Sequence, residues 1–170
     1  MDEVFGRVET SRTFLFTDIV DSTAFLAREG PEKWRKLLAR HDELVRDGIR
    51  ANAGEVIKHT GDGFFAAFDS PKAAVDAAIA IQRALAAETY APEVRIGAHA
   101  GGAFRTRPGD YGGEAVHLAA RIGAAARKGE ILVSRETLDG YATAFRTSDA
   151  RAQQLKGFEQ PVEVVSIEWR

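Results

Sequence analysis

The chain has 170 residues, and this length is typical of a single domain. Its 23 basic and 25 acidic residues give a net charge of −2 at neutral pH, which argues against bulk electrostatic capture of nucleic acid or of an anionic membrane. The absence of cysteine excludes a disulfide framework, a thiolate zinc site and a cysteine nucleophile.

The N-terminal segment gives no sign of export or of membrane insertion. No apolar run approaches the roughly 18 residues of a membrane span. The first residues are acidic where a signal peptide carries lysine or arginine. We therefore expect a cytoplasmic protein, with residues 1–11 as an N-terminal tail and residues 12–170 as one domain.

The first predicted element is a short apolar strand over residues 13–16, which ends just before Asp18. After it, Ser22 or Thr23 is suited to cap a first helical turn.

A second helix is predicted to begin at Gly30-Pro31 and to stop near Gly54. Apolar side chains recur along it at steps of three and four residues, which indicates one buried face. The members of that face are Trp34, Leu37, Leu38, His41, Leu44, Val45 and Ile49. His41 is expected to be a packed core residue.

A hairpin is predicted next, because Asp-Gly between two apolar runs is a strong hairpin signal. Its strands cover residues 55–60 and 64–69, around Gly61-Asp62-Gly63. Ser70-Pro71 then has the pattern of a cap and first helical position. The buried face of that helix is predicted as Ala74, Val75, Ala78, Ile81 and Leu85.

The remaining predicted elements lie in the second half of the chain. They are strands over 94–100 and 103–105, a small-residue helix over 115–126, a strand over 131–133, a helix capped by Ser134 and a terminal strand over 162–169. The strand residue His99 is expected to pack in the core.

The order of these elements predicts the fold class α+β. The core elements follow the ferredoxin-like βαββαβ order, extended by a further helix and strands. We expect an antiparallel or mixed sheet, with the helices packed mainly on one face.

Two aspartates at strand ends are the strongest candidates for chemistry. Asp18 ends the first strand and Asp62 lies at the tip of the hairpin. In a ferredoxin-like sheet these two elements are neighbours, so their carboxylates can hold Mg²⁺ or Mn²⁺ through hard oxygen ligands. Asp62 alone would be read as a turn residue, and its pairing with Asp18 favours the metal site.

Several separated motifs together resemble the class III nucleotide cyclase catalytic domain. They are Phe-Thr-Asp-Ile-Val-Asp-Ser-Thr from residue 16, Val-Ile-Lys-His-Thr-Gly-Asp-Gly-Phe from residue 56, Val-Arg-Ile-Gly-Ala-His-Ala-Gly from residue 94, Asp-Tyr-Gly-Gly-Glu-Ala-Val-His-Leu-Ala-Ala-Arg from residue 110, Gly-Glu-Ile-Leu-Val-Ser from residue 129 and Leu-Lys-Gly-Phe from residue 155. The resemblance spans about residues 12–170, so this range is expected to be the catalytic domain.

The resemblance implies a two-metal site on Asp18, Asp62 and the backbone carbonyl of Ile19. One divalent ion, Mg²⁺ or Mn²⁺, would activate the ribose 3′-hydroxyl and the other would hold the triphosphate. Backbone N–H groups around Ser22 and Thr23, at a helix start, would contact phosphate oxygens.

Lys58 and Asp110 match the pair that selects the purine in that family. Adenine offers an acceptor at N1 and a donor at its 6-amino group, which suits a donor-only lysine and an acceptor-only aspartate. Guanine presents the opposite pattern. Either residue alone would be read as a solvated side chain, and together they favour ATP.

Four further residues match positions that act on ribose or phosphate. Arg121 matches the transition-state arginine of the family, and Arg95 and Lys156 match phosphate-binding positions. His117 occupies the place of the usual ribose-holding asparagine of the family, and a histidine there is bulkier and titrates.

The sequence therefore predicts an adenylate cyclase that converts ATP into 3′,5′-cyclic AMP and pyrophosphate, and the resemblance implies a head-to-tail homodimer with shared active sites. Three alternatives stay open. A catalytically weak or inactive nucleotide-binding regulatory domain is favoured by His117, and a guanylate cyclase is disfavoured by Lys58 and Asp110. A nucleic-acid-binding domain would need a basic face and exposed aromatic residues, which the charge balance does not indicate.

Overall fold

The computed structural model describes residues 10–89, 91–107 and 109–170. Its strands are β1 (Thr10–Ile19), β2 (Glu55–Thr60), β3 (Gly63–Phe68), β4 (Val94–Ala103), β5 (Ile131–Ser134), β6 (Arg151–Gln153) and β7 (Val162–Ser166). Its helices are α2 (Ser22–Glu29), α3 (Pro31–Ala51), α4 (Pro71–Ala86), α5 (Glu114–Ala125) and the 3₁₀ helix η1 (Arg135–Leu138). Residues 1–9 of the expected tail lie outside the described residues, and β1 already begins at Thr10.

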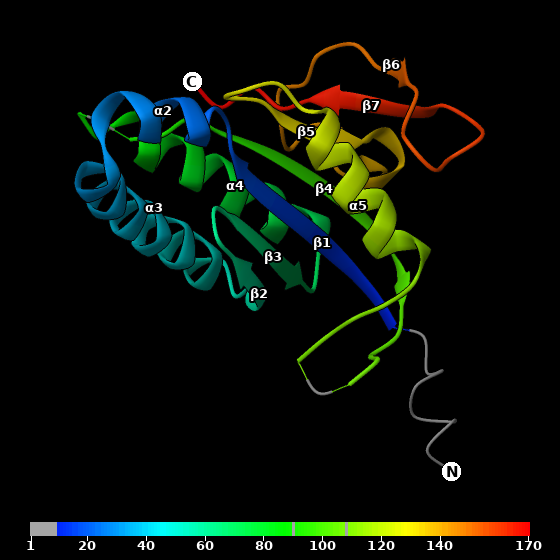
Figure 1. The fold of residues 1–170 in the computed structure, drawn as a ribbon. Helices are drawn as coiled ribbons and strands as arrows, with labels where there is room; N and C mark the ends of the chain where they lie inside the picture. Colours follow the sequence, from blue (N-terminus) through cyan, green and yellow to red (C-terminus); the bar gives the residue numbers. More distant parts are fainter. Residues whose placement is uncertain (1–9, 90, 108) are drawn as a thin grey trace.

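The strands form one seven-stranded sheet in the order β2-β3-β1-β4-β5-β7-β6 (Figure 1). The pairs β1–β3, β1–β4 and β2–β3 are antiparallel, whereas β4 and β5 are parallel. The expected α+β class and the ferredoxin-like order of the first four strands are thereby confirmed, as is a mixed sheet. The two strands expected over 94–105 form a single strand, β4, that runs through the glycine pair.

Helices cover both faces of the sheet. The long helices α3 and α4 lie on one face, and α5 crosses the other face over β1 and β4 (Figure 1). The alternation of β1 explains this division, because Leu15 joins the core under α3 and α4 whereas Phe14 joins the cluster under α5. The expectation of helices mainly on one face therefore fails for α5.

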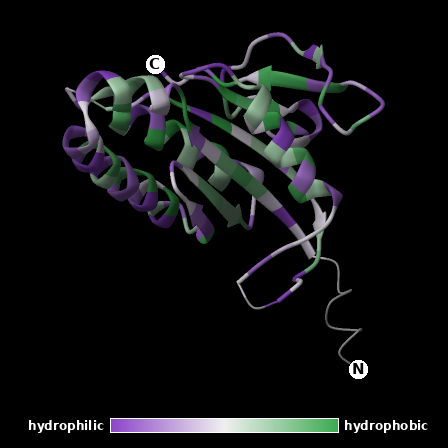
Figure 2. Ribbon diagram, in the orientation of Figure 1, coloured by the Kyte–Doolittle hydropathy of each residue, from purple (hydrophilic) through white to green (hydrophobic). Residues whose placement is uncertain are grey.

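A close backbone approach allows α5 to lie on the sheet. A Cβ atom built on Gly97 of β4 would lie 2.2 Å from the backbone nitrogen of Gly123 in α5. Only a residue without a side chain fits there. Figure 2 shows the hydrophobic residues concentrated along the strands, with many hydrophilic residues on α3.

The predicted helix caps have different outcomes. Ser134 precedes the short 3₁₀ helix η1 and makes no side-chain cap hydrogen bond, so the cap predicted there is wrong. Ser70 caps α4 as expected, since its hydroxyl accepts a hydrogen bond of 3.1 Å from the N–H of Ala73. At α2, however, the N-cap residue is Asp21, with φ of 61°, and Ser22 is the first helical residue. Ser22 does not cap this helix because its hydroxyl donates instead to the carboxylate of Asp62, at 3.1 Å.

His41 in α3 and His99 in β4 are both buried, so the prediction that each is a core residue is confirmed.

None of the helices in the described ranges combines the length and the apolar character needed to cross a membrane.

Candidate active site

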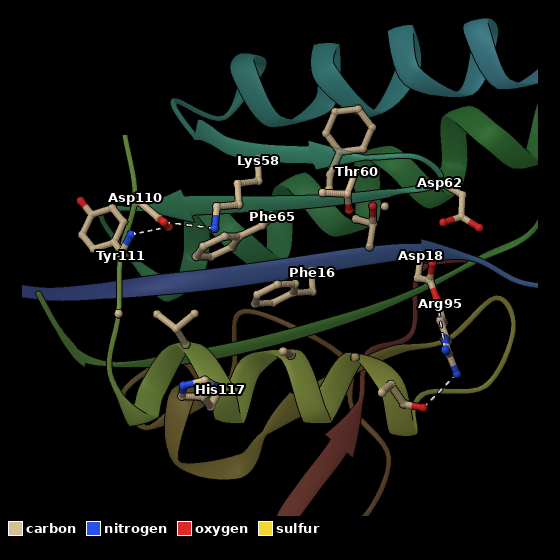
Figure 3. A pocket seen from close by; sticks show the side chains of 18 residues that line it. Phe16, Asp18, Lys58, Thr60, Asp62, Phe65, Arg95, Asp110, Tyr111 and His117 are labelled. Atoms are coloured by element: carbon tan, nitrogen blue, oxygen red, sulfur yellow. Dashed lines mark hydrogen bonds and ion pairs between the residues drawn. The ribbon is translucent and has the colours of Figure 1, made fainter. Parts of the chain in front are cut away.

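A groove of about 520 Å³ lies between the sheet and α5 (Figure 3). Strands β1 to β4, the loop before α5 and α5 itself all contribute to its walls. Six residues proposed from the sequence line it: Asp18, Lys58, Asp62, Arg95, Asp110 and His117.

One end of the groove carries two carboxylates. Asp18 lies at the end of β1, beside the turn that holds Asp62, because the N–H of Ile19 donates to the carbonyl of Asp62 at 3.2 Å. Burial and the neighbouring charge of Asp62 raise the pKa of Asp18, although Arg95 acts against this rise. Two acidic groups therefore share a site that favours added positive charge.

Arg95 supplies part of that charge. Its guanidinium donates to Asp18 Oδ2 at 3.1 Å and to the carbonyl of Ala124, near the end of α5, at 2.9 Å. Arg95 thus connects the carboxylate end of the groove to the helix.

The donor set fits a hard divalent cation. Asp18 and Asp62 offer carboxylate oxygens, the ligands that Mg²⁺ and Mn²⁺ prefer, and their mutual repulsion would be relieved by a cation. No group of three or more acidic or histidine side chains with metal-binding geometry occurs in the described ranges. The remaining ligands would therefore have to come from backbone carbonyls, phosphate oxygens or water.

The other end of the groove carries Lys58 and Asp110. Lys58 Nζ, on β2, lies 3.1 Å from Asp110 Oδ2, in the loop before α5. The second oxygen, Asp110 Oδ1, accepts from the N–H of Tyr111 at 2.8 Å. The hydrogen bond from Lys58 lowers the pKa of Asp110, so at neutral pH this end presents a cationic donor beside an ionised acceptor.

An aromatic floor joins the two ends. The rings of Phe16 and Phe65 are stacked, with centroids 4.5 Å apart and an interplanar angle of 4°. Sequence reasoning missed these rings as site residues, although strand alternation places Phe16 on the same face as Asp18. Tyr111, which also lines the groove, was missed as well.

Five residues proposed from the sequence do not line the groove. Ser22 contacts it indirectly through Asp62, and Ile19 is buried next to that carboxylate pair. Thr23 on α2, Arg121 on α5 and Lys156 in the turn after β6 are exposed and lie outside it. Within one chain, the proposed catalytic set is therefore only partly assembled.

Comparison with known sequences gives consistent similarities. The family model described as the adenylate and guanylate cyclase catalytic domain matches residues 9–168. An uncharacterized protein of Mycobacterium tuberculosis is 33% identical over 147 residues, which cover 86% of this chain and 38% of that protein. An adenylate cyclase of Streptomyces coelicolor is 30% identical over 139 residues, which cover 82% of this chain and 35% of the enzyme. The chain thus spans well under half the length of these relatives.

Solved structures show the same fold. The adenylyl cyclase CyaB from P. aeruginosa superposes with a TM-score of 0.83 at 22% identity, covering 95% of each chain. The guanylyl cyclase Cya2 superposes with a TM-score of 0.82 at 23% identity, covering 95% of this chain and 93% of the other. The fold is therefore common to proteins that act on different purines.

Proposed function

The chain belongs to the family of adenylate and guanylate cyclase catalytic domains, and from this premise we propose that it is an adenylate cyclase that converts ATP into 3′,5′-cyclic AMP and pyrophosphate. The contact of 3.1 Å between Lys58 and Asp110 is the observation that carries the choice of ATP. The lysine would donate to N1 of adenine and the aspartate would accept from the 6-amino group. Guanine reverses donor and acceptor at these two positions, so the same pair disfavours GTP.

In the proposed reaction the ribose 3′-oxygen bonds to the α-phosphorus, the bond from that phosphorus to the bridging oxygen breaks, and pyrophosphate leaves. The hydroxyl proton is released to solvent. Asp18, Asp62 and the carbonyl of Ile19 would hold two divalent cations, Mg²⁺ or Mn²⁺. When bound, such cations supply Lewis-acid activation of the hydroxyl and neutralise phosphate charge.

The other residues would bind and orient the nucleotide. Arg95 lies beside Asp18 and is suited to contact phosphate oxygens, and Lys156 and the N–H groups of Ser22 and Thr23 would add to this contact. Arg121 would stabilise the charge that develops on the α-phosphoryl group, while His117 would hold the ribose through one ring nitrogen.

We propose further that two copies assemble head to tail and share their active sites. The carboxylate end and the base-selecting end lie at opposite ends of one groove (Figure 3), and Arg121, Thr23 and Lys156 lie outside it. In such a dimer, Asp18 and Asp62 of one copy would face Lys58, Asp110, His117 and Arg121 of the other copy. ATP is a cytoplasmic nucleotide, and a cytoplasmic location forms part of the same proposal.

A single assay tests the activity. Purified protein is incubated with ATP or GTP and with Mn²⁺ or Mg²⁺, and both cyclic nucleotides are quantified. We expect cyclic AMP to exceed cyclic GMP, with more product in Mn²⁺, and no product from an Asp18→Ala control. A preference for GTP would instead support a guanylate cyclase.

The competing proposal is a nucleotide-binding regulatory domain of low or absent activity. The presence of histidine at position 117, where asparagine is usual, favours it. Nucleotide binding without any cyclic product, in both metals, would establish this alternative.

A further inference from the structure

Arg12 connects two parts of the molecule that carry the base-selecting pair. Its Nη1 donates to the hydroxyl of Tyr111 at 2.7 Å and to Glu55 Oε1 at 3.3 Å. Its Nε donates to the carbonyl of Phe68 at 3.4 Å. The Arg12 side chain is only 13% exposed, so this guanidinium lies inside the junction of β1, β2, β3 and the loop before α5.

Two of the three side-chain partners of Arg12, Glu55 and Tyr111, are close neighbours of Lys58 and Asp110. The third, Asp69, lies 3.5 Å from Arg12 Nη2 and is 90% exposed. Glu55 begins β2, three positions before Lys58, and Tyr111 directly follows Asp110. We propose that Arg12 is a positioning residue that fixes the separation of Lys58 and Asp110 and thereby sets the purine preference. This inference rests on the proposed function, since it concerns the base-selecting pair of that reaction.

The ion pair of Lys58 and Asp110 by itself does little to fix the relative position of the two residues. The Lys58 side chain is 53% exposed, and such exposed pairs contribute little because water screens them. β2 is moreover an edge strand, and its register with β3 shifts between Val56 and Lys58. A strand with an irregular register on a sheet edge needs another contact to fix its position.

On the loop side of the connection, Tyr111 is buried and closely packed. Tyr111 is 6% exposed, and its ring packs edge-on against Phe14, with centroids 5.3 Å apart. The backbone N–H of Tyr111 donates to Asp110 Oδ1 at 2.8 Å. A restraint on the Tyr111 hydroxyl therefore reaches the Asp110 carboxylate through a single residue.

Arg105 offers a matched control. It also contacts Glu55 Oε1, at 3.3 Å, and lies over the Tyr111 ring at 4.5 Å from the centroid. Its side chain is 44% exposed, and no hydrogen bond joins it to the Tyr111 hydroxyl among the contacts of the described residues. Arg105→Met removes a cation from the same cluster without breaking the connection made by Arg12.

The experiment compares Arg12→Met, Tyr111→Phe, their double variant and Arg105→Met. We measure kcat and KM for ATP and GTP, together with thermal stability. Loss of a hydrogen bond from a charged donor corresponds to about a tenfold effect. We therefore expect the KM for ATP to rise about five- to tenfold in Arg12→Met, with kcat within about twofold of wild type.

The preference for ATP over GTP should fall in parallel. Tyr111→Phe should shift the preference in the same direction. The double variant should be no worse than Arg12→Met, because Arg12→Met already breaks the bond between Arg12 and the Tyr111 hydroxyl that Tyr111→Phe removes. Arg105→Met should keep the wild-type preference. A purely structural role for Arg12 would lower thermal stability and leave the KM and the ATP preference unchanged, and that result would overturn the proposal.

A second measurement separates this inference from the proposed activity. Binding of 3′-deoxy-ATP and 3′-deoxy-GTP, which lack the nucleophile, is measured by calorimetry in Mn²⁺. Should wild-type protein form no cyclic nucleotide, the proposed function fails while binding still tests Arg12. The inference holds if Arg12→Met reduces the preference for 3′-deoxy-ATP at least about fivefold, and it is rejected if the preference is unchanged. If Arg12→Met does not fold, Tyr111→Phe decides by the same criteria.

Discussion

At the scale of single residues, Asp18 and Asp62 support the metal proposal through their shared position at two strand ends. Replacing either with alanine should lower kcat/KM by about 100-fold or more, since one charged ligand of the proposed phosphoryl-transfer site is lost. Thermal stability should stay the same or rise. Burial and the charge of Asp62 raise the pKa of Asp18, which means that two ionised carboxylates at this place are unfavourable in the folded protein. Cyclic nucleotide assays and thermal melts measure both effects.

Asp149→Ala is the control for these substitutions, because its side chain is exposed and lies outside the groove. It should keep full activity. Near-normal turnover in Asp18→Ala or Asp62→Ala would rule out the metal assignment.

The two buried histidines predict that the folded protein becomes less stable in acid. Burial lowers the pKa of both His41 and His99, so the folded state binds fewer protons than the unfolded chain. Above the unfolded pKa of about 6.5, the two histidines should therefore leave the free energy of unfolding at its full value. As the pH falls below that value, the free energy of unfolding should decrease by at most about 1.4 kcal/mol per pH unit for each histidine. Urea denaturation between pH 5 and pH 8 measures this slope.

His99→Gln should flatten the dependence, since it removes one of the two groups. The exposed substitution Leu26→Ser is the comparison, and it should shift the unfolding free energy equally at every pH. A wild-type curve that is flat between pH 5 and pH 7 would contradict the prediction.

At the scale of elements, the contact of β4 with α5 depends on two facing glycines. A Cβ atom on Gly97 would lie 2.2 Å from the backbone of Gly123, whereas a Cβ atom on Gly123 would have its nearest neighbours at 3.4 Å. Gly97→Ala should therefore destabilise the protein by about 2–3 kcal/mol. It should also reduce activity, because α5 carries His117 and Arg121.

Gly123→Ala is the matched variant. Its slight crowding is offset by the better helix propensity of alanine, about 1 kcal/mol, so its unfolding free energy should stay close to that of wild type. Equal effects of the two substitutions in chemical denaturation would show that the helix shifts freely on the sheet.

Elements with strong local signals could be predicted from the sequence. The Asp-Gly turn and the Ser70-Pro71 helix start depend on neighbouring residues alone, and both were predicted correctly. Ser22 was predicted wrongly as a cap because its hydroxyl bonds to Asp62, forty positions away. The face covered by α5 was also missed, since β1 is apolar on both sides and its pattern does not distinguish them.

At the scale of the whole molecule, the proposed shared site predicts complementation between inactive variants. Asp18→Ala and Arg121→Ala homodimers should each be inactive. In a mixed dimer, one of the two sites would contain only unmutated residues. Random exchange makes about half of the dimers mixed, so activity should recover to about a quarter of the wild-type value.

Subunit exchange must be verified separately, for example by energy transfer between labelled chains. Proven exchange without any recovered activity would contradict the shared site.

Long-range contacts limited what the sequence could predict about the site. Asp18 and Asp62 could be paired in advance, because the ferredoxin-like order places their strands side by side. The connection from Arg12 to Tyr111 joins residues 99 positions apart, and no local pattern indicates it. Contacts of this kind depend on side-chain conformations that only the assembled sheet determines.

The position of β7 has a consequence for the time course of folding. β7 follows every other strand in the described chain but lies inside the sheet, between β5 and β6. During synthesis the outer edge of β5 stays open until Val162–Ser166 has emerged, and such non-local pairing is a slow step. Trp169, just beyond β7, is 8% exposed, and its indole N–H donates to the carbonyl of Gly129 at 2.8 Å. Trp34 is the only other tryptophan, so a Trp34→Phe variant fluoresces from Trp169 alone. Its fluorescence change during refolding therefore reports when the sheet is completed.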